Sequence, residues 1–492
     1  MHDADLLTTA QMREADRLAM AAGIAGLTLM RRAGQAVAAV AQRGLREGSA
    51  IGVLCGPGNN GGDGYVAAAR LRGLGFAVRL FALAPPRPET DAARAAAFWG
   101  GPVEHVAAFQ PEAFELVIDA LLGAGLTRMV SGEEAALIAR LNDAERPVLA
   151  VDLPSGVDGD TGAVRGVAVK AQRCVTFFRA KPGHFLYPGR ALAGVVDVAD
   201  IGIEAHVLGS IKPLTFANLP ALWGGHLAAG TATQHKYARG HALIIAGGRE
   251  GAGAARLAAR AALRIGAGLV TLAVPPEAFA TYAARGPDAL MFRAMTSLED
   301  MLHDQRRNAV LIGPAHGVGP ATRAAVLHLM ASPRALVLDA DALTSFAGEA
   351  ALLRDAARSR AAPCIMTPHE GEFARLMAGS LDSTQDKLSR ARQAAQMLHG
   401  VVVLKGADTV IAAPDGRAAI NANAPPWLAT AGSGDVLAGM ATGLLAQGLP
   451  AFEAACAAVY LHGAAGRAAG RGLIADDLPE ALRTCLDVLD KV

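Results

Sequence analysis

Residues 50–69 read AIGVLCGPGNNGGDGYVAAA, and this stretch decides the fold class. An apolar run from Ala50 to Cys55 leads into a glycine-rich loop, Gly56 to Gly64, and a small-residue run with helical character starts at Tyr65. A buried strand that feeds a helix through a glycine-rich turn is the building unit of a parallel sheet wrapped by helices. Backbone amides at the start of such a helix bind anions. The stretch therefore predicts an α/β layer structure with an anion site.

The same strand-then-helix rhythm continues on both sides of this unit. It fails between about residues 200 and 240, where Pro and Gly accumulate, so we place a domain junction near Leu214 and predict domains at 1–213 and 214–492. The fold class expected is α/β with two domains, the first a doubly wound sheet. The runs predicted as strands are Ala50 to Cys55, Ala77 to Leu83, Leu116 to Ala120, Val148 to Val151, Arg173 to Phe178, His241 to Ala246, Leu269 to Val274, Ala309 to Ile312, Ala335 to Leu338, Pro363 to Met366 and Val401 to Leu404.

Composition narrows the class of partner. The 492 residues are 52% hydrophobic and 18% charged with a net charge of +1, which argues against nucleic acid and leaves small molecules as the expected ligands. The longest uncharged stretch, Pro213 to His235, contains too many polar and glycine residues for a membrane span. Five cysteines without CxxC spacing and the start MHDAD indicate a reduced, cytoplasmic protein. Ala-rich helices leave apolar surface, so we expect a homo-oligomer.

Polar residues end several strands of the first half. The stretch Gly56 to Gly61 fits GxGxxG, but the next strand ends in Ala84-Pro85-Pro86 without the acid that a dinucleotide fingerprint needs. Carboxyl ends of parallel strands face one crevice, so Asn60, Asp119, Asp152 and Ser155 are expected to converge. Such oxygen ligands suit a hard cation, and two carboxylates suit acid/base catalysis. The alternative is that each Asp merely caps a helix.

The motifs PGNNGGDGY (57–65), VIDALLGAGL (117–126) and DLPSGVDGDTG (152–162) resemble the NAD(P)H-hydrate epimerase domain over about residues 8–205. This resemblance implies epimerisation at C6 of hydrated NADH or NADPH, with K⁺ held by Asn60, Asp119 and Ser155. The two strand-end carboxylates, Asp119 and Asp152, are the expected catalytic residues. Arg31 stands where that family usually has glutamate. The positions implied to bind substrate, besides Asp152, are Asn59, Asn60, Gly61, Gly62, Asp63, Gly123, Ala124, Gly125, Leu126, Thr127, Arg128 and Met129.

A second glycine-rich stretch, AGSGD at 431–435, precedes a small-residue helix expected from Val436 to Leu445. Its amides form an anion hole at the helix start, and Asp435 would lie beside it as a base. Upstream, MTPHEGE (366–372) and LKGADTV (404–410) follow two predicted strands. A lone histidine is more often structural than catalytic, yet His369 at a strand tip between Thr-Pro and Gly-Glu favours a site role.

These motifs, with the glycine loop at 247–255, resemble the ribokinase-like ADP- or ATP-dependent NAD(P)H-hydrate dehydratases over about residues 230–488. The resemblance implies dehydration of the S epimer, with Mg²⁺ and ADP or ATP as co-substrate and Asp435 as the base. Three departures are Glu370 in place of Pro, Ser433 in place of Thr, and a lengthened loop at 313–319. The positions implied to bind hydrate or nucleotide are Gly253, Gly317, His369, Lys405, Gly406, Ala407, Asp408, Thr409 and Gly434.

Two other functions stay open at this point. A small-alcohol kinase would have an accessory first domain, would release a stable phosphorylated product and would carry Asn at position 369, where this chain has His369. Alternatively, the first domain could bind a nucleotide or act as a scaffold without catalysis, although Asn60, Asp119, Asp152 and Ser155 are all present.

Overall fold

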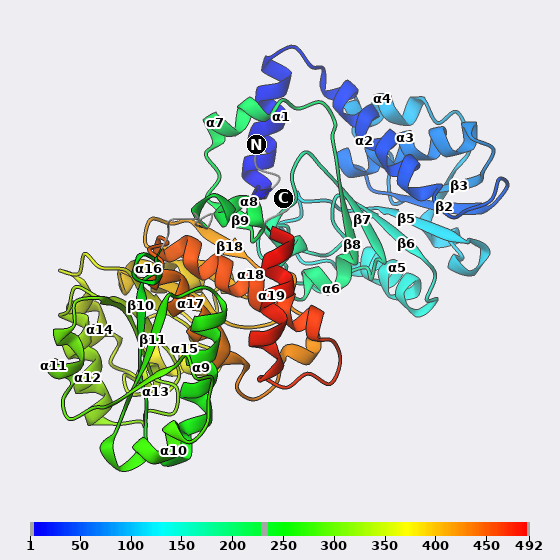
Figure 1. Ribbon diagram of the computed structural model, residues 1–492. Coiled ribbons are helices and arrows are strands. Elements are labelled where there is room, and N and C mark those ends of the chain that lie inside the picture. Colours follow the sequence, from blue (N-terminus) through cyan, green and yellow to red (C-terminus); the bar gives the residue numbers. More distant parts are fainter. Residues whose placement is uncertain (1–3, 228–234, 490–492) are drawn as a thin grey trace. The chain divides into compact units, whose positions relative to one another are not determined.

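The computed structural model describes residues 4–227 and 235–489, and Figure 1 traces the chain. Residues 1–3 of the start and residues 228–234 of the uncharged stretch, both considered above, lie outside the described residues. The chain divides into two compact units, the first reaching Thr215 and the second beginning at Phe216. Each unit is built around one sheet and is considered by itself.

The first unit contains a parallel sheet with strand order β4-β3-β2-β5-β6-β7-β8. The chain adds β3 and β4 on one side of β2 and then β5 to β8 on the other side, so the winding direction reverses between β2 and β5. Ligands bind in doubly wound sheets at such a switch point, at the carboxyl ends of the strands. Its strands are β2 (Ala50–Cys55), β3 (Ala77–Ala82), β4 (Val103–His105), β5 (Leu116–Ala120), β6 (Val148–Val151), β7 (Arg173–Phe177) and β8 (Val195–Ala199).

Helices cover both faces of this sheet. One face packs against α2 and α3 through a core that includes Val37, Ala67 and Ile118, and the other packs against α5 through Leu137 and Leu141. Thr8 caps α1 in a capping box with Gln11, as the sequence indicates. The short strand β1 (Asp5–Leu6) lies near the start of the unit, and β9 (Thr215–Ala217) begins at its last residue and belongs mostly to the second unit. The helices are α1 (Thr9–Ala21), α2 (Gly26–Ala41), α3 (Asn59–Gly73), α4 (Asp91–Ala97), α5 (Gly132–Asp143), α6 (Gly189–Ala193) and α7 (Leu208–Ile211).

The glycine-rich loop is shorter than predicted. Helix α3 begins at Asn59, not at Tyr65, so most of the predicted loop forms the first turns of the helix. The glycines there serve close packing: a Cβ on Gly61 would lie 1.9 Å from the carbonyl oxygen of Gly56, and one on Gly64 would lie 2.6 Å from the Ala120 Cβ. Glycine permits this approach, which outweighs its low helix propensity.

The second unit also has a largely parallel sheet. Strands β12, β11, β10, β13, β14, β15 and β16 pair in parallel in that order, and β17 and β18 continue the sheet antiparallel. The sequence missed β12, β17 and β18, which are short. The strands are β10 (His241–Ile245), β11 (Leu269–Val274), β12 (Met291–Ala294), β13 (Arg307–Ile312), β14 (Ala335–Leu338), β15 (Cys364–Met366), β16 (Val401–Leu404), β17 (Val410–Ala412) and β18 (Ala418–Ile420).

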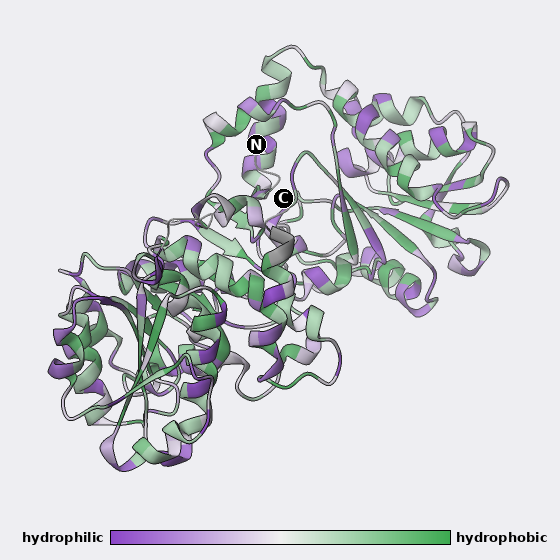
Figure 2. Ribbon diagram, in the orientation of Figure 1, coloured by the Kyte–Doolittle hydropathy of each residue, from purple (hydrophilic) through white to green (hydrophobic). Residues whose placement is uncertain are grey.

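Helices flank this sheet on both faces, with α9 on one and α12 and α14 on the other (Figure 1). Small residues let α9 and α17 approach closely, since a Cβ on Gly439 would lie 2.1 Å from the carbonyl oxygen of Ala258. Figure 2 shows that the strands and α17 are predominantly apolar. The helices are α8 (Pro220–Trp223), α9 (Ala252–Arg264), α10 (Phe279–Ala283), α11 (Leu298–His303), α12 (Pro320–Met330), α13 (Asp341–Thr344), α14 (Ala350–Ala357), α15 (Glu370–Leu376), α16 (Lys387–Met397), α17 (Ser433–Ala446), α18 (Ala451–Ala469) and α19 (Asp477–Leu489).

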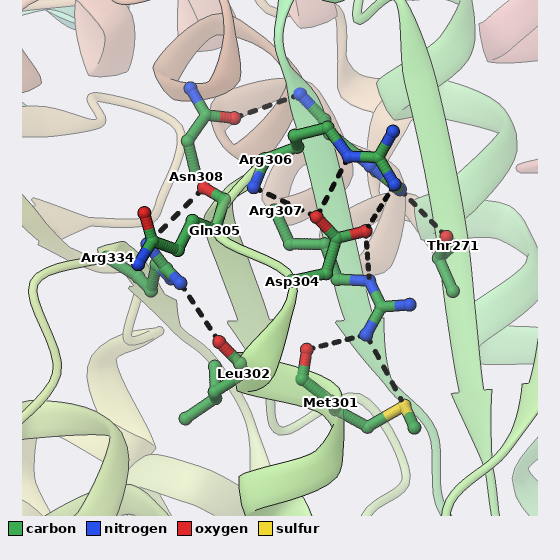
Figure 3. Close-up of polar contacts among 10 residues, drawn as sticks. Thr271, Met301, Leu302, Asp304, Gln305, Arg306, Arg307, Asn308 and Arg334 are labelled. Carbon is green, nitrogen blue, oxygen red and sulfur yellow. Dashed lines mark hydrogen bonds and ion pairs between the residues drawn. The ribbon is translucent and has the colours of Figure 1, made fainter.

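Polar contacts organise the segment that enters β13 (Figure 3). The Asp304 carboxylate accepts hydrogen bonds at 2.9 Å from the Arg306 guanidinium, and the buried Arg307 donates to the Met301 carbonyl at 2.6 Å. These contacts lie at the amino end of the strand, away from the carboxyl ends where ligands are expected. No helix in the described part of the chain is long and apolar enough to cross a membrane.

Candidate active sites

Asp119 and Ser155 meet at the switch point of the first sheet. Asp119, the fourth residue of β5, is completely buried, and its carboxylate accepts hydrogen bonds from the Ser155 hydroxyl at 2.6 Å and the Ser155 amide at 2.8 Å. Burial raises the pKa of Asp119 to about 6, against the lowering effect of Ser155 and the Leu121 amide. Because both carboxylate oxygens are engaged, Asp119 ties β5 to the loop after β6.

The oxygen atoms around this pair fit the predicted K⁺ ion. The Ser155 hydroxyl also lies 3.1 Å from the Leu122 carbonyl oxygen, so carboxylate, hydroxyl and carbonyl oxygens gather here. Asn60 is directed at the same segment, since a Cβ on Gly123 would lie 2.9 Å from its Oδ1. Its buried Nδ2 has no partner among the described residues. The oxygen and nitrogen of an Asn amide are assigned from their partners, and the opposite assignment makes this unpartnered buried atom an oxygen, the atom type that K⁺ takes as a ligand.

Asp152 is the charged centre of the first site. It follows β6 with a positive φ of 66°, a conformation that Asp tolerates better than most residues. Its Oδ1 lies 2.6 Å from the Nζ of Lys181, which is 1% exposed, and accepts a hydrogen bond from Thr176 at 2.9 Å. Although burial acts to raise the pKa of Asp152, the charge and hydrogen bond of Lys181 outweigh it and hold that pKa below its usual value. Asp152 is therefore ionised and largely buried.

His184 fixes the backbone of Asp152 without adding charge. Its Nδ1 accepts a hydrogen bond from the Lys181 amide at 2.9 Å, so Nε2 carries the proton and donates to the Asp152 carbonyl at 2.8 Å. Burial and the nearby Lys181 ammonium lower the pKa of His184 to about 4, and the ring stays neutral at physiological pH.

The predicted substrate segment 123–129 is only partly gathered at this centre. The Ala124 amide donates to Asp152 Oδ2 at 3.1 Å, which places its amino end at the site. Arg128 instead forms a bidentate pair with Glu134 at 2.6 and 2.7 Å, and Met129 is 60% exposed. The roles predicted for Arg128 and Met129 thus require this segment to rearrange around a ligand.

A lysine also organises the second site. Lys405, the first residue after β16, has its Nζ 3.0 Å from Asp339 and 3.7 Å from Glu372. Asp339, after β14, is 2% exposed and also accepts a hydrogen bond from Thr367 at 2.7 Å. Although burial acts to lower the pKa of Lys405, these carboxylates raise it, so the side chain is a permanent cation. Strand ends of β14, β15 and β16 therefore converge as the sequence predicts.

Asp435 lies beside this cation at the start of α17. Helix α17 begins at Ser433 after Gly432, whose φ is 86°, and the first amides of a helix have no intrahelical acceptor. A Cβ on Gly434 would lie 3.6 Å from the Lys405 Nζ, so lysine and helix start share one space. Burial, with the negative charge of Asp339, raises the pKa of Asp435 to about 6, a value suited to a general base.

His369 and Glu370 have distinct places at the edge of this site. His369 caps α15, and its Nδ1 accepts hydrogen bonds from the amides of Gly371 and Glu372 at 3.0 and 3.2 Å. The backbone of His369 also forms a parallel β-bridge with that of Lys405, which places His369 at the site. Glu370, the departure from the family pattern, pairs with Arg390 at 3.0 Å and points to helix α16, so its charge is compensated outside the centre.

The predicted nucleotide loop after β16 is held by its own side chains. Thr409 bonds back to Gly406, and Lys387 of α16 donates to Asp408 at 2.8 Å and to the Lys405 carbonyl at 3.4 Å. These contacts engage the Asp408 carboxylate and fix the loop against α16.

The two remaining predicted positions lie in neighbouring loops. Gly253 is in the first turn of α9 with open space at its Cα, and a Cβ on Gly247 would lie 1.9 Å from the Ala315 carbonyl oxygen, so the loops before α9 and α12 pack together. The Gly317 amide donates to Asp341 at 2.9 Å. Asp341 in turn acts electrostatically on Asp435, which connects the lengthened loop with the site.

No cluster of three or more His, Cys, Asp or Glu side chains with metal-ligand geometry occurs in residues 4–227 and 235–489. Three carboxylates, those of Asp339, Glu372 and Asp435, act electrostatically on Lys405, and Asp341 acts on Asp435. This excess of negative charge fits a Mg²⁺ ion that is bound together with phosphate oxygens.

Comparisons with known proteins match both units of the chain. A family model described as NAD(P)H-hydrate dehydratase matches residues 242–485, and one described as YjeF-related protein N-terminus matches residues 26–183. The bifunctional NAD(P)H-hydrate repair enzyme of Salinibacter ruber is 38% identical over 96% of this chain and 94% of its own length. That of Escherichia coli is 35% identical over 96% and 92%. The chain belongs to this family.

Membership confirms the predicted α/β class, with a doubly wound first unit and a ribokinase-like second unit. Among solved structures, an ADP/ATP-dependent NAD(P)H-hydrate dehydratase from Bacillus subtilis, co-crystallised with ATP/Mg²⁺, is 28% identical over 54% of this chain and 94% of its own, with a TM-score of 0.47. The roles of the individual site residues stay predictions.

Several side chains at the two centres were missed by sequence reasoning. Lys181 and His184 come from a short 3₁₀ turn after β7, and Lys387 comes from α16. Asp16 comes from α1, and it acts electrostatically on Asp63 and is itself acted on by Asp152. None of them stands in a glycine-rich motif or directly at a strand end, so local sequence signals do not mark them.

Proposed function

We propose that this chain repairs hydrated nicotinamide nucleotides. One site interconverts the R and S epimers of NAD(P)HX at C6. The other dehydrates the S epimer with ADP or ATP, giving NAD(P)H, phosphate and AMP or ADP. We assign the epimerase to residues 1–213 and the dehydratase to residues 214–492. The observation that carries this proposal is that the chain holds two partly or largely buried carboxylates, Asp152 and Asp435, each at the carboxyl edge of a sheet. Asp152 lies beside the buried Lys181, and Asp435 lies beside the partly buried Lys405.

In the dehydratase, Asp435 accepts the proton of the C6 hydroxyl while that oxygen attacks the terminal phosphorus of the nucleotide. The free amides at the start of α17 and the Lys405 ammonium stabilise the transferring group. The C6 phosphate ester then leaves as phosphate and a proton leaves C5, which restores the ring double bond. Mg²⁺, when bound, offsets the phosphate charge, and Asp339 and Glu372 are the carboxylates placed to hold it.

In the epimerase, Asp152 is the base that accepts the proton of the same hydroxyl, kept ionised by Lys181. K⁺, when bound by Asn60, Asp119 and Ser155, supplies a fixed positive charge at the switch point, next to the segment that binds substrate. We further propose that the enzyme is cytoplasmic and oligomeric. The five cysteines, all free in the structure, support a reducing compartment.

Two matched variants test this assignment. Asp152→Asn should stop epimer interconversion but leave dehydration of the S epimer intact, and Asp435→Asn should do the reverse while still binding nucleotide. Each variant is thus the control for the folding of the other. Loss of both activities in either variant, or retention of both, contradicts the division into two sites.

A further inference from the structure

Two carboxylates at the first site form no direct ion pair with a described residue. Asp63, in the first turns of α3, and Asp16, on α1, are both partly buried. Within the described residues, neither carboxyl group accepts a hydrogen bond or lies in ion-pair contact with a Lys or Arg. Structural carboxylates in such places are normally paired. None of the carboxylate oxygens of Asp16 and Asp63 is both fully buried and unpaired, so these oxygens face accessible space.

The fold brings both to Asp152. Asp63 follows β2, and Asp152 follows β6, at the carboxyl edge of the same parallel sheet. Helix α1 is anchored there by Thr9, whose amide and hydroxyl contact Asp160 at 2.6 and 3.1 Å, and by the Leu7 amide, which donates to the Ala180 carbonyl next to Lys181. The charges of Asp152, Asp16 and Lys181 act on Asp63, so the four groups lie within electrostatic reach of one another, and Asp152 and Lys181 are in direct contact.

The three carboxyl groups are held in different protonation states. Lys181 neutralises Asp152 and keeps its pKa low. Burial, then the negative charges of Asp152 and Asp16, raise the pKa of Asp63 well above its usual value, and burial raises that of Asp16 to about 6. Neighbouring carboxyl groups whose environments push their pKa values apart divide into a base and an acid.

We propose that Asp63 is the general acid of the epimerase site and that Asp16 is the positioning residue that keeps the proton on Asp63. This inference rests on the proposed epimerase function. The sequence resemblance implies only that Asp63 contacts substrate, and it implies no role for Asp16. The charged and titratable groups that face Asp63 are Asp16 from α1, the neutral thiol of Cys55 at the end of β2, Asp152 after β6, and Lys181 after β7 with its neutral neighbour His184.

The reaction is balanced without any further reactant. Asp152 takes the proton of the C6 hydroxyl, the C6–N1 bond breaks with its electron pair going to N1, and Asp63 gives its proton to N1. The ring is then open, with an aldehyde at C6. After rotation about C5–C6, N1 attacks the other face of the aldehyde and returns its proton to Asp63, while Asp152 returns its proton to the new hydroxyl. Both residues end in their starting states.

The test compares three variants in the full chain, with epimer exchange followed by NMR or chromatography of NADHX. Asp63→Asn should lower kcat for exchange by about 10²- to 10⁴-fold, the usual contribution of a general acid. Asp16→Asn removes a negative charge that raises the pKa of Asp63. Its activity at low pH should therefore be near that of the wild type, but the alkaline limb of its pH profile should move to lower pH. Asp16→Glu should restore the limb.

Glu14→Gln is the matched control, since Glu14 lies on the same helix and pairs with Arg17 on its exposed side. It should leave the profile unchanged, and dehydration of the S epimer reports folding in every variant. An active Asp63→Asn variant, or an Asp16→Asn variant whose alkaline limb is unshifted, overturns the inference. If Asp152→Asn also exchanges epimers at the wild-type rate, or the wild type does not exchange them, the proposed function itself fails.

Discussion

Lys181→Met removes the cation of a buried ion pair and leaves the Asp152 carboxylate in place. The two side chains are 1% and 14% exposed, so little solvent remains to replace the lost charge. Breaking such a pair costs about 3–5 kcal/mol, because the remaining charge is buried without compensation. For a unit of this size, about 2–4 °C of melting temperature corresponds to each kcal/mol, so the first unit should melt about 6–20 °C earlier.

Calorimetry or circular dichroism measures this shift in melting temperature, and dehydratase activity shows whether the second unit remains folded. The pKa of Asp152 is depressed in the folded state, so its contribution is full above the unfolded pKa and is lost as the pH falls through the folded one. The difference in melting temperature between the wild type and the variant should therefore be largest at neutral pH and should disappear below about pH 4.

Asp152→Asn in the Lys181→Met background is the control for this reasoning. It removes the stranded charge, so the double variant should be less destabilised than the sum of the single variants by about 0.5–3 kcal/mol. A Lys181→Met protein that unfolds within about 0.5 kcal/mol of the wild type at neutral pH, with additive double-variant behaviour, would refute the claim that this pair is buried and charged.

Three further outcomes are expected. Dehydratase kcat/KM should rise as the pH increases through about 6, because Asp435 must lose its proton, and a profile flat across that region contradicts its role as base. In α3, Gly64→Ala should destabilise the fold because the new methyl group collides with Ala120. Gly73→Ala in the same helix has open space and should stabilise the fold by about 0.5–1 kcal/mol. Equal shifts in melting temperature for the two variants would contradict the role of close packing at Gly64. Glu370 is the first residue of α15, a position where Pro is favoured, and Glu370→Pro loses only exposed ion pairs. The free energy of unfolding from chemical denaturation should therefore change by less than about 1 kcal/mol.

Some of the fold follows from local sequence. Parallel strands were recognisable as short apolar runs, and polar residues at their ends marked Asp119, Asp152 and Lys405 because carboxyl ends share one edge. The start of α3 was misjudged, because glycine normally breaks helices. In this helix Gly61 and Gly64 are required by the close approach of other backbone and side-chain atoms, which is a property of tertiary structure.

The charge partners of the sites could not be predicted in the same way. Lys181 reaches Asp152 from 29 positions away in the sequence, out of a turn that looks unremarkable. Asp16 occupies a position typical of the polar side of an amphipathic helix, and its place at the site depends on the distant contact between Thr9 and Asp160. Non-local electrostatic contacts of this kind decide protonation states, and a single sequence does not display them.

A coupled assay shows whether one chain carries both repair activities. Purified protein is mixed with an epimeric mixture of NADHX, K⁺, Mg²⁺ and either ADP or ATP, and the return of dihydronicotinamide absorbance is followed together with phosphate release. The account predicts complete recovery of both epimers with one phosphate released for each NADH formed. Recovery that stops when the S epimer is exhausted would contradict the epimerase, and nucleotide consumption without any NADH would contradict the account as a whole.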